Sequence, residues 1–141
     1  MKSIAHTKYY LTSAIIIVWL ALVSIGDTNE HIFIHEIASV DSYFLVTLKS
    51  NTEPIPLNEI HQWLIHVKTS NNQPVENATI LIDGGMPVHN HGLPTHPVAT
   101  EIGGGDYLID GVKFSMTGDW ELWLYISTAT LSDKVKVNLT F

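Results

Sequence analysis

Apolar and polar residues alternate along most of the chain after residue 40. The segments 43–49 and 59–69 show this period of two clearly, and it is the period of a β-strand that has one face against a hydrophobic core. The alternation predicts that one set of side chains in these two segments is buried. That set comprises Phe44, Val46, Leu48, His61, Trp63, Ile65 and Val67.

Shorter apolar segments follow, separated by clusters of glycine, proline, asparagine and aspartate. Turn signals recur roughly every 8–12 residues, a spacing typical of β-sandwiches and small barrels. No helical period longer than about two turns occurs after Ile25. The sequence therefore predicts an all-β antiparallel domain of seven to eight strands, and the later strands are expected at 78–82, 99–101, 107–109, 112–116, 120–127 and 134–141.

The N-terminus has a different pattern. Lys2 and Lys8 precede Tyr9–Ile25, a run without any charge that just reaches the lower limit of about 17 residues for a membrane-spanning helix. A positive lead followed by an apolar run is typical of a secretory signal or a signal anchor. We expect residues 1–26 to form one hydrophobic helix, either an anchor or a cleaved signal peptide, and residues 27–39 to be a linker.

Either topology exports the remaining domain, residues 40–141. We expect it in the periplasm or on the outer face of the cytoplasmic membrane, with an anchor favoured over a cleaved peptide. Beyond residue 26 the chain has five lysines, no arginine and fourteen carboxylates, a net charge of −9. This acidic balance argues against nucleic acid as a partner and attracts cations.

The longest stretch without periodicity, residues 83–97, contains most of the candidate functional residues. It holds three of the eight histidines, and its three prolines argue against disorder. Met86, His89 and His91 form the pattern M-x-x-H-x-H. Imidazole combined with thioether suits copper better than magnesium, calcium or manganese. Because the chain has no cysteine, any soft-metal site must be built from histidine and methionine.

A structural interpretation of the same residues stays open. Met86 can be a hydrophobic plug beneath the loop, and a histidine can simply bond a loop carbonyl. Met116 shares a predicted strand face with Val112 and Phe114, so we expect it first to be a core residue. It reaches the loop only if the end of its strand lies beside it.

Catalytic motifs are not found. No serine lies in a nucleophile-elbow pattern, and Gly103–Gly105 lacks the Lys-Ser/Thr of a phosphate-binding loop. Asp106 and Asp110 are more simply turn residues. We therefore do not expect an enzyme.

Between about His61 and Tyr125 the chain carries the motifs H-x-W, G-G-M-P-x-H-x-H-G-L-P-T, G-x-G-x-Y and F-x-M-x-G-x-W-E-L. In these motifs it resembles the YtkA-like domain family. The resemblance implies a small exported or membrane-anchored bacterial domain with an immunoglobulin-like β-sandwich. Some such domains lie near FixH-type proteins linked to copper and oxidase maturation, and their Met/His loop is often taken as a copper site. Carried over by position, the implied metal ligands are Met86, His89, His91 and Met116.

Two functions follow as hypotheses. The first is copper handling or delivery, with Cu(I) or Cu(II) as the ion and a membrane protein or an oxidase-assembly factor as the partner. The alternative is a non-metal interaction module, in which the rigid loop docks a membrane protein complex and Met86 is a hydrophobic anchor. His96 occupies a position that need not be histidine in the family, so it is not included among the ligands.

Overall fold

The structure is a computed structural model that describes residues 34–141, and the predicted N-terminal helix lies outside this range. No helix within the described range is long and apolar enough to span a bilayer. Each strand pair is antiparallel, which confirms the all-β antiparallel prediction. The elements are β1 (Ile34–Ala38), β2 (Phe44–Ser50), β3 (His61–Thr69), β4 (Thr79–Met86), the 3-10 helix η1 (Pro87–His89), β5 (His91–Gly92), β6 (Val98–Gly103), β7 (Asp106–Val112), β8 (Asp119–Ser127) and β9 (Ser132–Thr140).

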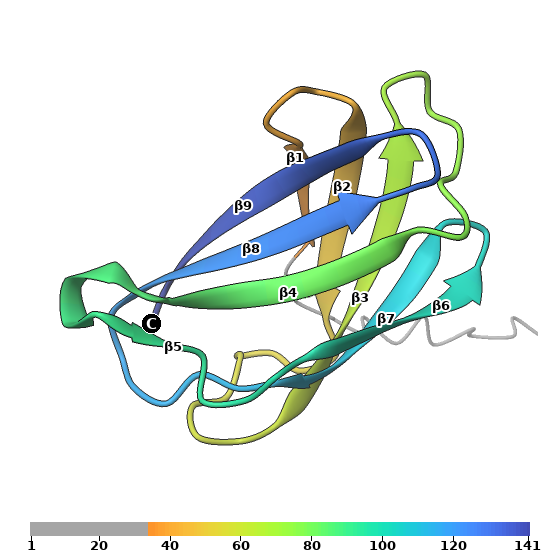
Figure 1. Ribbon diagram of the computed structural model, residues 1–141. Coiled ribbons are helices and arrows are strands. Elements are labelled where there is room, and N and C mark those ends of the chain that lie inside the picture. The colour runs from red at the N-terminus through yellow and green to blue at the C-terminus, as the bar shows by residue number, and fades with distance from the viewer. Residues whose placement is uncertain (1–33) are drawn as a thin grey trace, which may run out of the picture.

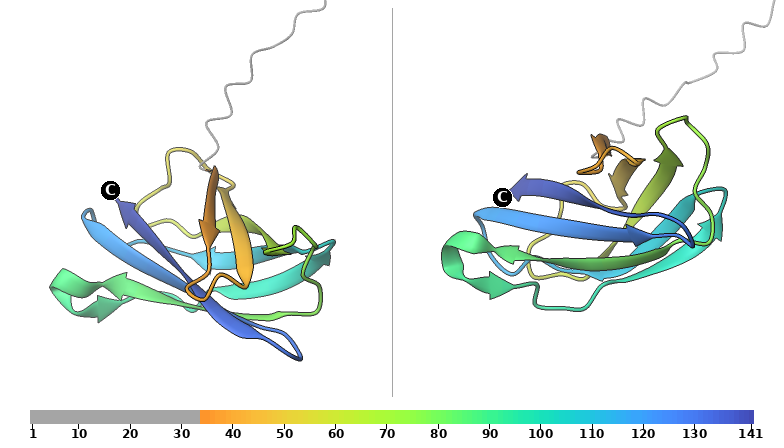
Figure 2. Two further views of the ribbon diagram at one scale, coloured as in Figure 1. Left: turned by 90° about the horizontal axis from the view of Figure 1, so that it is seen from above. Right: turned by 45° about the horizontal axis from the view of Figure 1, so that its top comes forward.

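The strands follow one hydrogen-bonded path, β1-β2-β3-β7-β6-β4-β8-β9, with β5 added beside β4. The path curls so that its two ends approach each other (Figures 1 and 2). Between β6 and β4 the ladder is reduced to the pair Leu81 and Val98. At the other end, the Val40 N–H donates to the Lys134 carbonyl over 2.9 Å. The molecule is thus a nearly closed barrel rather than two separate sheets, because β6 joins the two halves.

The predicted core is confirmed. Side chains alternate between buried and half-buried along β2 and along most of β3, in the phase that the sequence indicates. Trp120 is buried in β8, whereas Trp123 lies on the opposite face and is half-buried. The described part of the predicted linker forms β1, which pairs with β2 and packs Ile37 against the core.

The segment 83–86 belongs to the stretch in which the sequence shows no strand period, but it is the end of β4 and contains Gly84 and Gly85. A Cβ on Gly84 would lie 2.5 Å from the Glu121 carbonyl oxygen of β8. These glycines therefore mark close approach of backbones inside a sheet rather than a turn.

Gly111 marks a second difference. The sequence suggested a tight turn at Asp110 and Gly111, but β7 continues through both residues to Val112. Gly111 has a positive φ of 85°, and the pairing of β7 with β3 shifts register beside it, between His61 and Trp63. A bulge of this kind uses glycine for its left-handed conformation. The strand then ends, so alternation does not continue to Met116.

Candidate metal site at the β4–β5 hairpin

The Met/His segment is an ordered hairpin that projects from one end of the molecule (Figure 1). Pro87 starts the 3-10 helix η1, where its fixed φ is favourable. Asn90 then adopts the left-handed conformation, with φ 52° and ψ 43°, and this turn sends β5 back along β4. In the short ladder that results, Gly85 pairs with Gly92 and Met86 pairs with His91.

Met86 is one of the core residues of this end of the barrel, with 1% of its surface exposed. Its methyl group occupies the space beside Gly118: a Cβ built on Gly118 would lie 2.6 Å from the Met86 Cε. Because directly opposed residues of an antiparallel pair point to the same side of the sheet, Met86 and His91 share the inner side of the hairpin.

The structure brings His89 and His91 together. Their ring centroids are 6.2 Å apart and the planes are nearly parallel, at 26°. In an extended segment, the two-residue spacing of His89 and His91 would place both rings on one side. Instead, His89 ends η1 and His91 begins β5, and the left-handed Asn90 between them aligns the rings.

His91 has one nitrogen engaged and one without a partner. Nδ1 lies 3.0 Å from the Gly92 carbonyl oxygen. A carbonyl only accepts, so in the neutral ring Nδ1 carries the proton and Nε2 presents its lone pair. Nε2 is buried and has no hydrogen-bond partner among the described residues. Buried polar atoms are almost always paired, so this nitrogen is the feature of the hairpin that most needs an explanation.

Met116 is not a core residue: it lies in the loop between β7 and β8 and is 42% exposed. That expectation was wrong because β7 ends at Val112. Its backbone is nevertheless tied to the hairpin through Trp120, whose Nε1–H donates to the Met116 carbonyl over 3.0 Å. The Trp120 ring meets the His91 ring in an edge-on contact, with centroids 5.4 Å apart.

Within residues 34–141, no group of three histidine, aspartate or glutamate side chains converges to hold a metal. His96 is exposed and takes part in no ring contact with the hairpin pair. The donors that the structure brings to this end are Met86, His89, His91 and, through Trp120, the loop of Met116.

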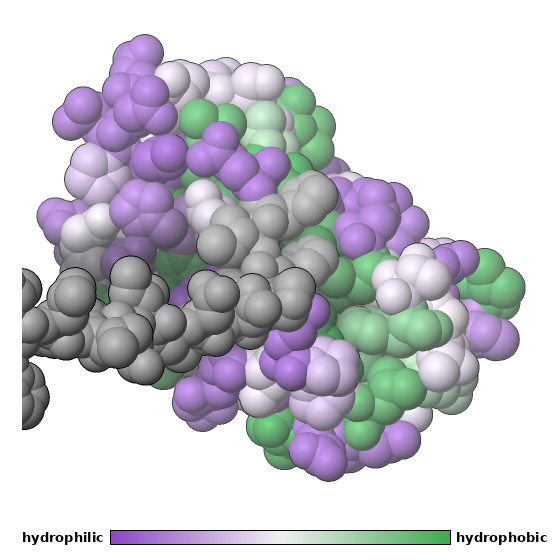
Figure 3. Space-filling view, turned by 180° about the vertical axis from the view of Figure 1, so that it is seen from behind, coloured by the Kyte–Doolittle hydropathy of each residue, from purple (hydrophilic) through white to green (hydrophobic). Residues whose placement is uncertain are grey.

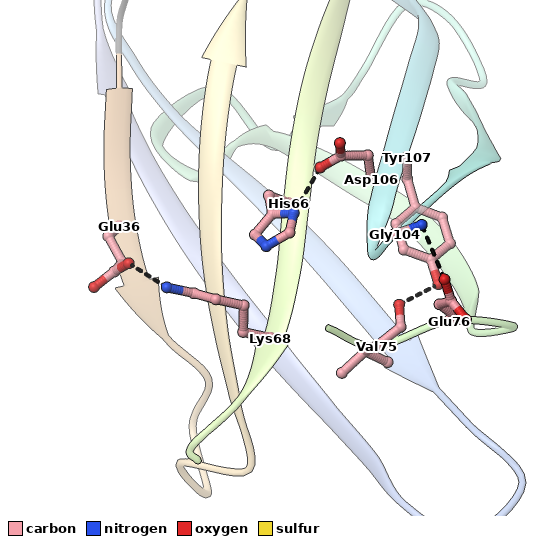
Figure 4. Close-up of polar contacts among 8 residues, drawn as sticks. All are labelled: Glu36, His66, Lys68, Val75, Glu76, Gly104, Asp106 and Tyr107. Atoms are coloured by element: carbon pink, nitrogen blue, oxygen red, sulfur yellow. Dashed lines mark hydrogen bonds and ion pairs between the residues drawn. The ribbon is translucent and has the colours of Figure 1, made fainter. Parts of the chain in front are cut away.

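The other described histidines have structural surroundings. His61 is a core residue, as expected, with 4% exposed, and burial lowers its pKa although a hydrogen bond to the Glu59 carbonyl opposes this. His66, expected to be solvated, is half-buried and its Nδ1 lies 2.6 Å from an Asp106 carboxylate oxygen on the outer face (Figure 4).

A groove of about 390 Å³ borders the hairpin on the outer face of β4 and β8. Sequence reasoning did not find it. The paired glycines at Gly84 and Gly85, followed by an outward-facing Trp123, were its only signal. In Figure 3, hydrophobic surface is interspersed with hydrophilic surface at the end of the molecule that carries the hairpin. The residues that line the groove include Asp83, Asn90, His91, Glu121, Trp123 and Tyr125.

Residues 43–124 match the sequence profile of the family described as YtkA-like. The chain belongs to the YtkA-like family. This match runs from β2 into β8 and contains all four candidate residues of the hairpin and the Met116 loop. No curated protein and no solved structure matches the chain.

Proposed function

We propose that this YtkA-like protein is an exported, membrane-associated accessory domain that binds copper at the β4–β5 hairpin and handles or delivers it. The carrying observation is the His91 Nε2 atom, which is buried without a hydrogen-bond partner in the part of the chain that the structure describes. Leaving a polar atom in that state costs about 1–3 kcal/mol. A bound metal ion would take up its lone pair.

The donor set favours monovalent copper over harder ions. Met86, whose thioether is buried, pairs with His91 in the β4–β5 ladder, and the His89 ring lies near the His91 ring. The exposed Met116 lies in the loop held by Trp120. Thioether and imidazole donors in a partly dry site suit Cu(I). Copper supplies redox and ligand-exchange chemistry when bound. The protein's own residues bind the ion and exclude water.

Export and membrane association are part of the proposal and rest on the lysine-flanked apolar run at residues 9–25 and on the family. The resemblance also implies an immunoglobulin-like sandwich. Its two facing halves would correspond to β1-β2-β3-β7-β6 and β4-β8-β9 of the curled sheet. The oxidase-assembly or other membrane protein that receives the ion would approach the projecting hairpin.

Competition with a Cu(I) chelator tests the function. We expect the full-length chain to bind about one Cu(I) and His89→Ala/His91→Ala to lose that binding, because both imidazoles are removed. His96→Ala is the matched control, since His96 lies in the same segment but outside the ring pair, and it should bind like the unaltered chain. Equal uptake by all three proteins would overturn the proposal.

One observation favours the alternative, a non-metal docking module. Val88 at the tip of η1 is 82% exposed, and an apolar side chain so exposed at a projecting tip suits a contact with another protein. Met86 cannot be the anchor of such a contact, because it is buried. A membrane partner captured equally well with and without chelator, and lost with Val88→Asp, would support docking without metal.

A further inference from the structure

Trp120 contacts both halves of the candidate site. It is 1% exposed, in the second position of β8. Its Nε1–H donates to the Met116 carbonyl over 3.0 Å, and its ring meets the His91 ring edge-on, at 72° and 5.4 Å between centroids. One side chain thus links the loop after β7 to the hairpin after β4, two segments about 25 residues apart in sequence.

Three contacts leave His91 little freedom. The Gly92 carbonyl engages Nδ1, the nearly parallel His89 ring lies with its centroid 6.2 Å away, and the Trp120 ring meets the His91 ring edge-on at 5.4 Å. A ring held in this way presents Nε2 in one direction, as carbonyl and aromatic partners do for metal-binding histidines in general. The Trp120 ring is itself fixed, because its indole N–H is bonded and its other neighbour is Phe114, at 5.2 Å.

We infer that Trp120 is the positioning residue of the hairpin: it orients the His91 imidazole and keeps the Met116 loop beside it. The part of this inference that concerns metal binding rests on the proposed function, whereas the part that concerns the orientation of His91 does not. Trp120 itself supplies no ligand atom to the proposed metal site. It acts through His91 and through the Met116 backbone.

The chain contains a matched control in the same strand. Trp123 is also in β8 but faces outward, where its ring lies near Lys134 and Lys136, at 5.0 and 5.5 Å from the ring centroid. A substitution of Trp123 removes an indole of the same size from β8 without touching the contacts of His91.

The first readout is nuclear magnetic resonance of the metal-free, full-length chain. We expect His91 to show a single tautomer protonated at Nδ1, and proton–proton contacts with the Trp120 ring. In Trp120→Phe the indole donor is lost, so these contacts should weaken and the His91 signals should shift, whereas Trp123→Phe should leave them unchanged. A His91 ring without Trp120 contacts in the unaltered chain would overturn the inference without any need for a variant to fold.

The second readout is Cu(I) affinity by chelator competition. Loss of a partner that orients a metal ligand typically costs about 10- to 100-fold in affinity, and we expect this loss for Trp120→Phe but not for Trp123→Phe. In a His91→Ala background, Trp120→Phe should add little, since its effect passes through His91. Unchanged affinity in a folded Trp120→Phe would overturn the inference. If the unaltered chain binds no copper, the proposed function fails, while the magnetic resonance result still decides whether Trp120 orders His91.

Discussion

At the scale of single residues, Gly118 determines how Met86 is seated. Gly118 has a φ of +126°, and a Cβ there would lie 2.6 Å from the Met86 Cε. The backbone conformation favours glycine, and an added Cβ would force the end of the buried Met86 side chain to move. Within the motif F-x-M-x-G-x-W, Gly118 thus lies against Met86 and Trp120 contacts His91, while the Met116 carbonyl accepts the Trp120 indole hydrogen bond.

Gly118→Ala should destabilise the fold by about 1–3 kcal/mol, because it adds a clash with Met86 to the cost of the positive φ. Gly103→Ala is the control, since Gly103 also has a positive φ, of +99°, but nothing lies within 4 Å of its added Cβ. Urea denaturation of both variants separates the two costs. A loss no greater for Gly118→Ala than for Gly103→Ala would show that Met86 is not seated against Gly118.

His61 makes stability depend on pH. Its ring packs beside those of Trp63 and Phe114, with centroids at 6.3 and 5.7 Å, and burial lowers its pKa from 6.5. Below about pH 6.5 the unfolded chain therefore takes up a proton before the folded chain does, so stability falls as the pH falls. His61→Phe should keep the ring packing and reduce this slope between pH 7.5 and 5. Equal slopes in denaturation series of both proteins would contradict a buried, neutral His61.

The alternation of polar and apolar residues predicted the buried face of β3, because burial and the period of a strand are local properties. It did not predict that His61 Nε2 and His91 Nε2 lack hydrogen-bond partners. That property depends on which strands of distant sequence surround each ring. The prediction for Met116 was wrong for the same reason. Its burial depends on where β7 ends, and β7 ends at Val112, directly after the bulge at Gly111.

At the scale of elements, Asp133 closes the barrel between β9 and the turn that joins β1 to β2. Its carboxylate accepts hydrogen bonds from the backbone N–H groups of Asp41, Tyr43 and Lys134. Burial alone would raise the pKa of Asp133, but these bonds and one from the Ser39 hydroxyl together lower it. The carboxylate thus joins the two ends of the strand path.

Asp133→Asn should destabilise the fold by about 1–3 kcal/mol at neutral pH, since charge-assisted hydrogen bonds are lost. Because the folded pKa is lowered, the contribution of Asp133 is complete above its ordinary value of 3.8 and disappears as the pH falls through the folded pKa. The variant and the unaltered chain should therefore approach each other in stability at about pH 2. Asp110→Asn is the control, and a gap that persists unchanged in acid would contradict the assignment.

The hairpin depends on the close approach of β5 to β4. A Cβ on Gly85 would collide with the His91 carbonyl oxygen, whereas a Cβ on Gly92 would have its nearest neighbour, the Gly84 carbonyl oxygen, at 3.4 Å. Gly85→Ala should therefore displace His91 and weaken Cu(I) binding, and Gly92→Ala should be tolerated. Magnetic resonance shifts of His91, together with Cu(I) competition, check both variants. Equal behaviour of the two would show that the β4–β5 ladder does not set the site.

At the scale of the whole molecule, the curled sheet places the Met/His hairpin at one end and leaves its tip projecting (Figure 2). The sequence predicted the all-β class because strand periods and turn residues can be recognised within short stretches of the chain. It did not predict that the strands form one path, since that depends on the single β6–β4 contact. The formal net charge of −7 for the chain would raise the local concentration of cations around the molecule.

X-ray absorption at the copper edge tests the central claim most directly, because it identifies the donor atoms. For the full-length chain loaded with one equivalent of Cu(I), we predict both imidazole nitrogen and thioether sulfur in the first shell. The imidazole signal should be lost in His89→Ala/His91→Ala and kept in His96→Ala. A first shell without sulfur, or one identical in all three proteins, would contradict a copper site built from the histidines and methionines of this hairpin.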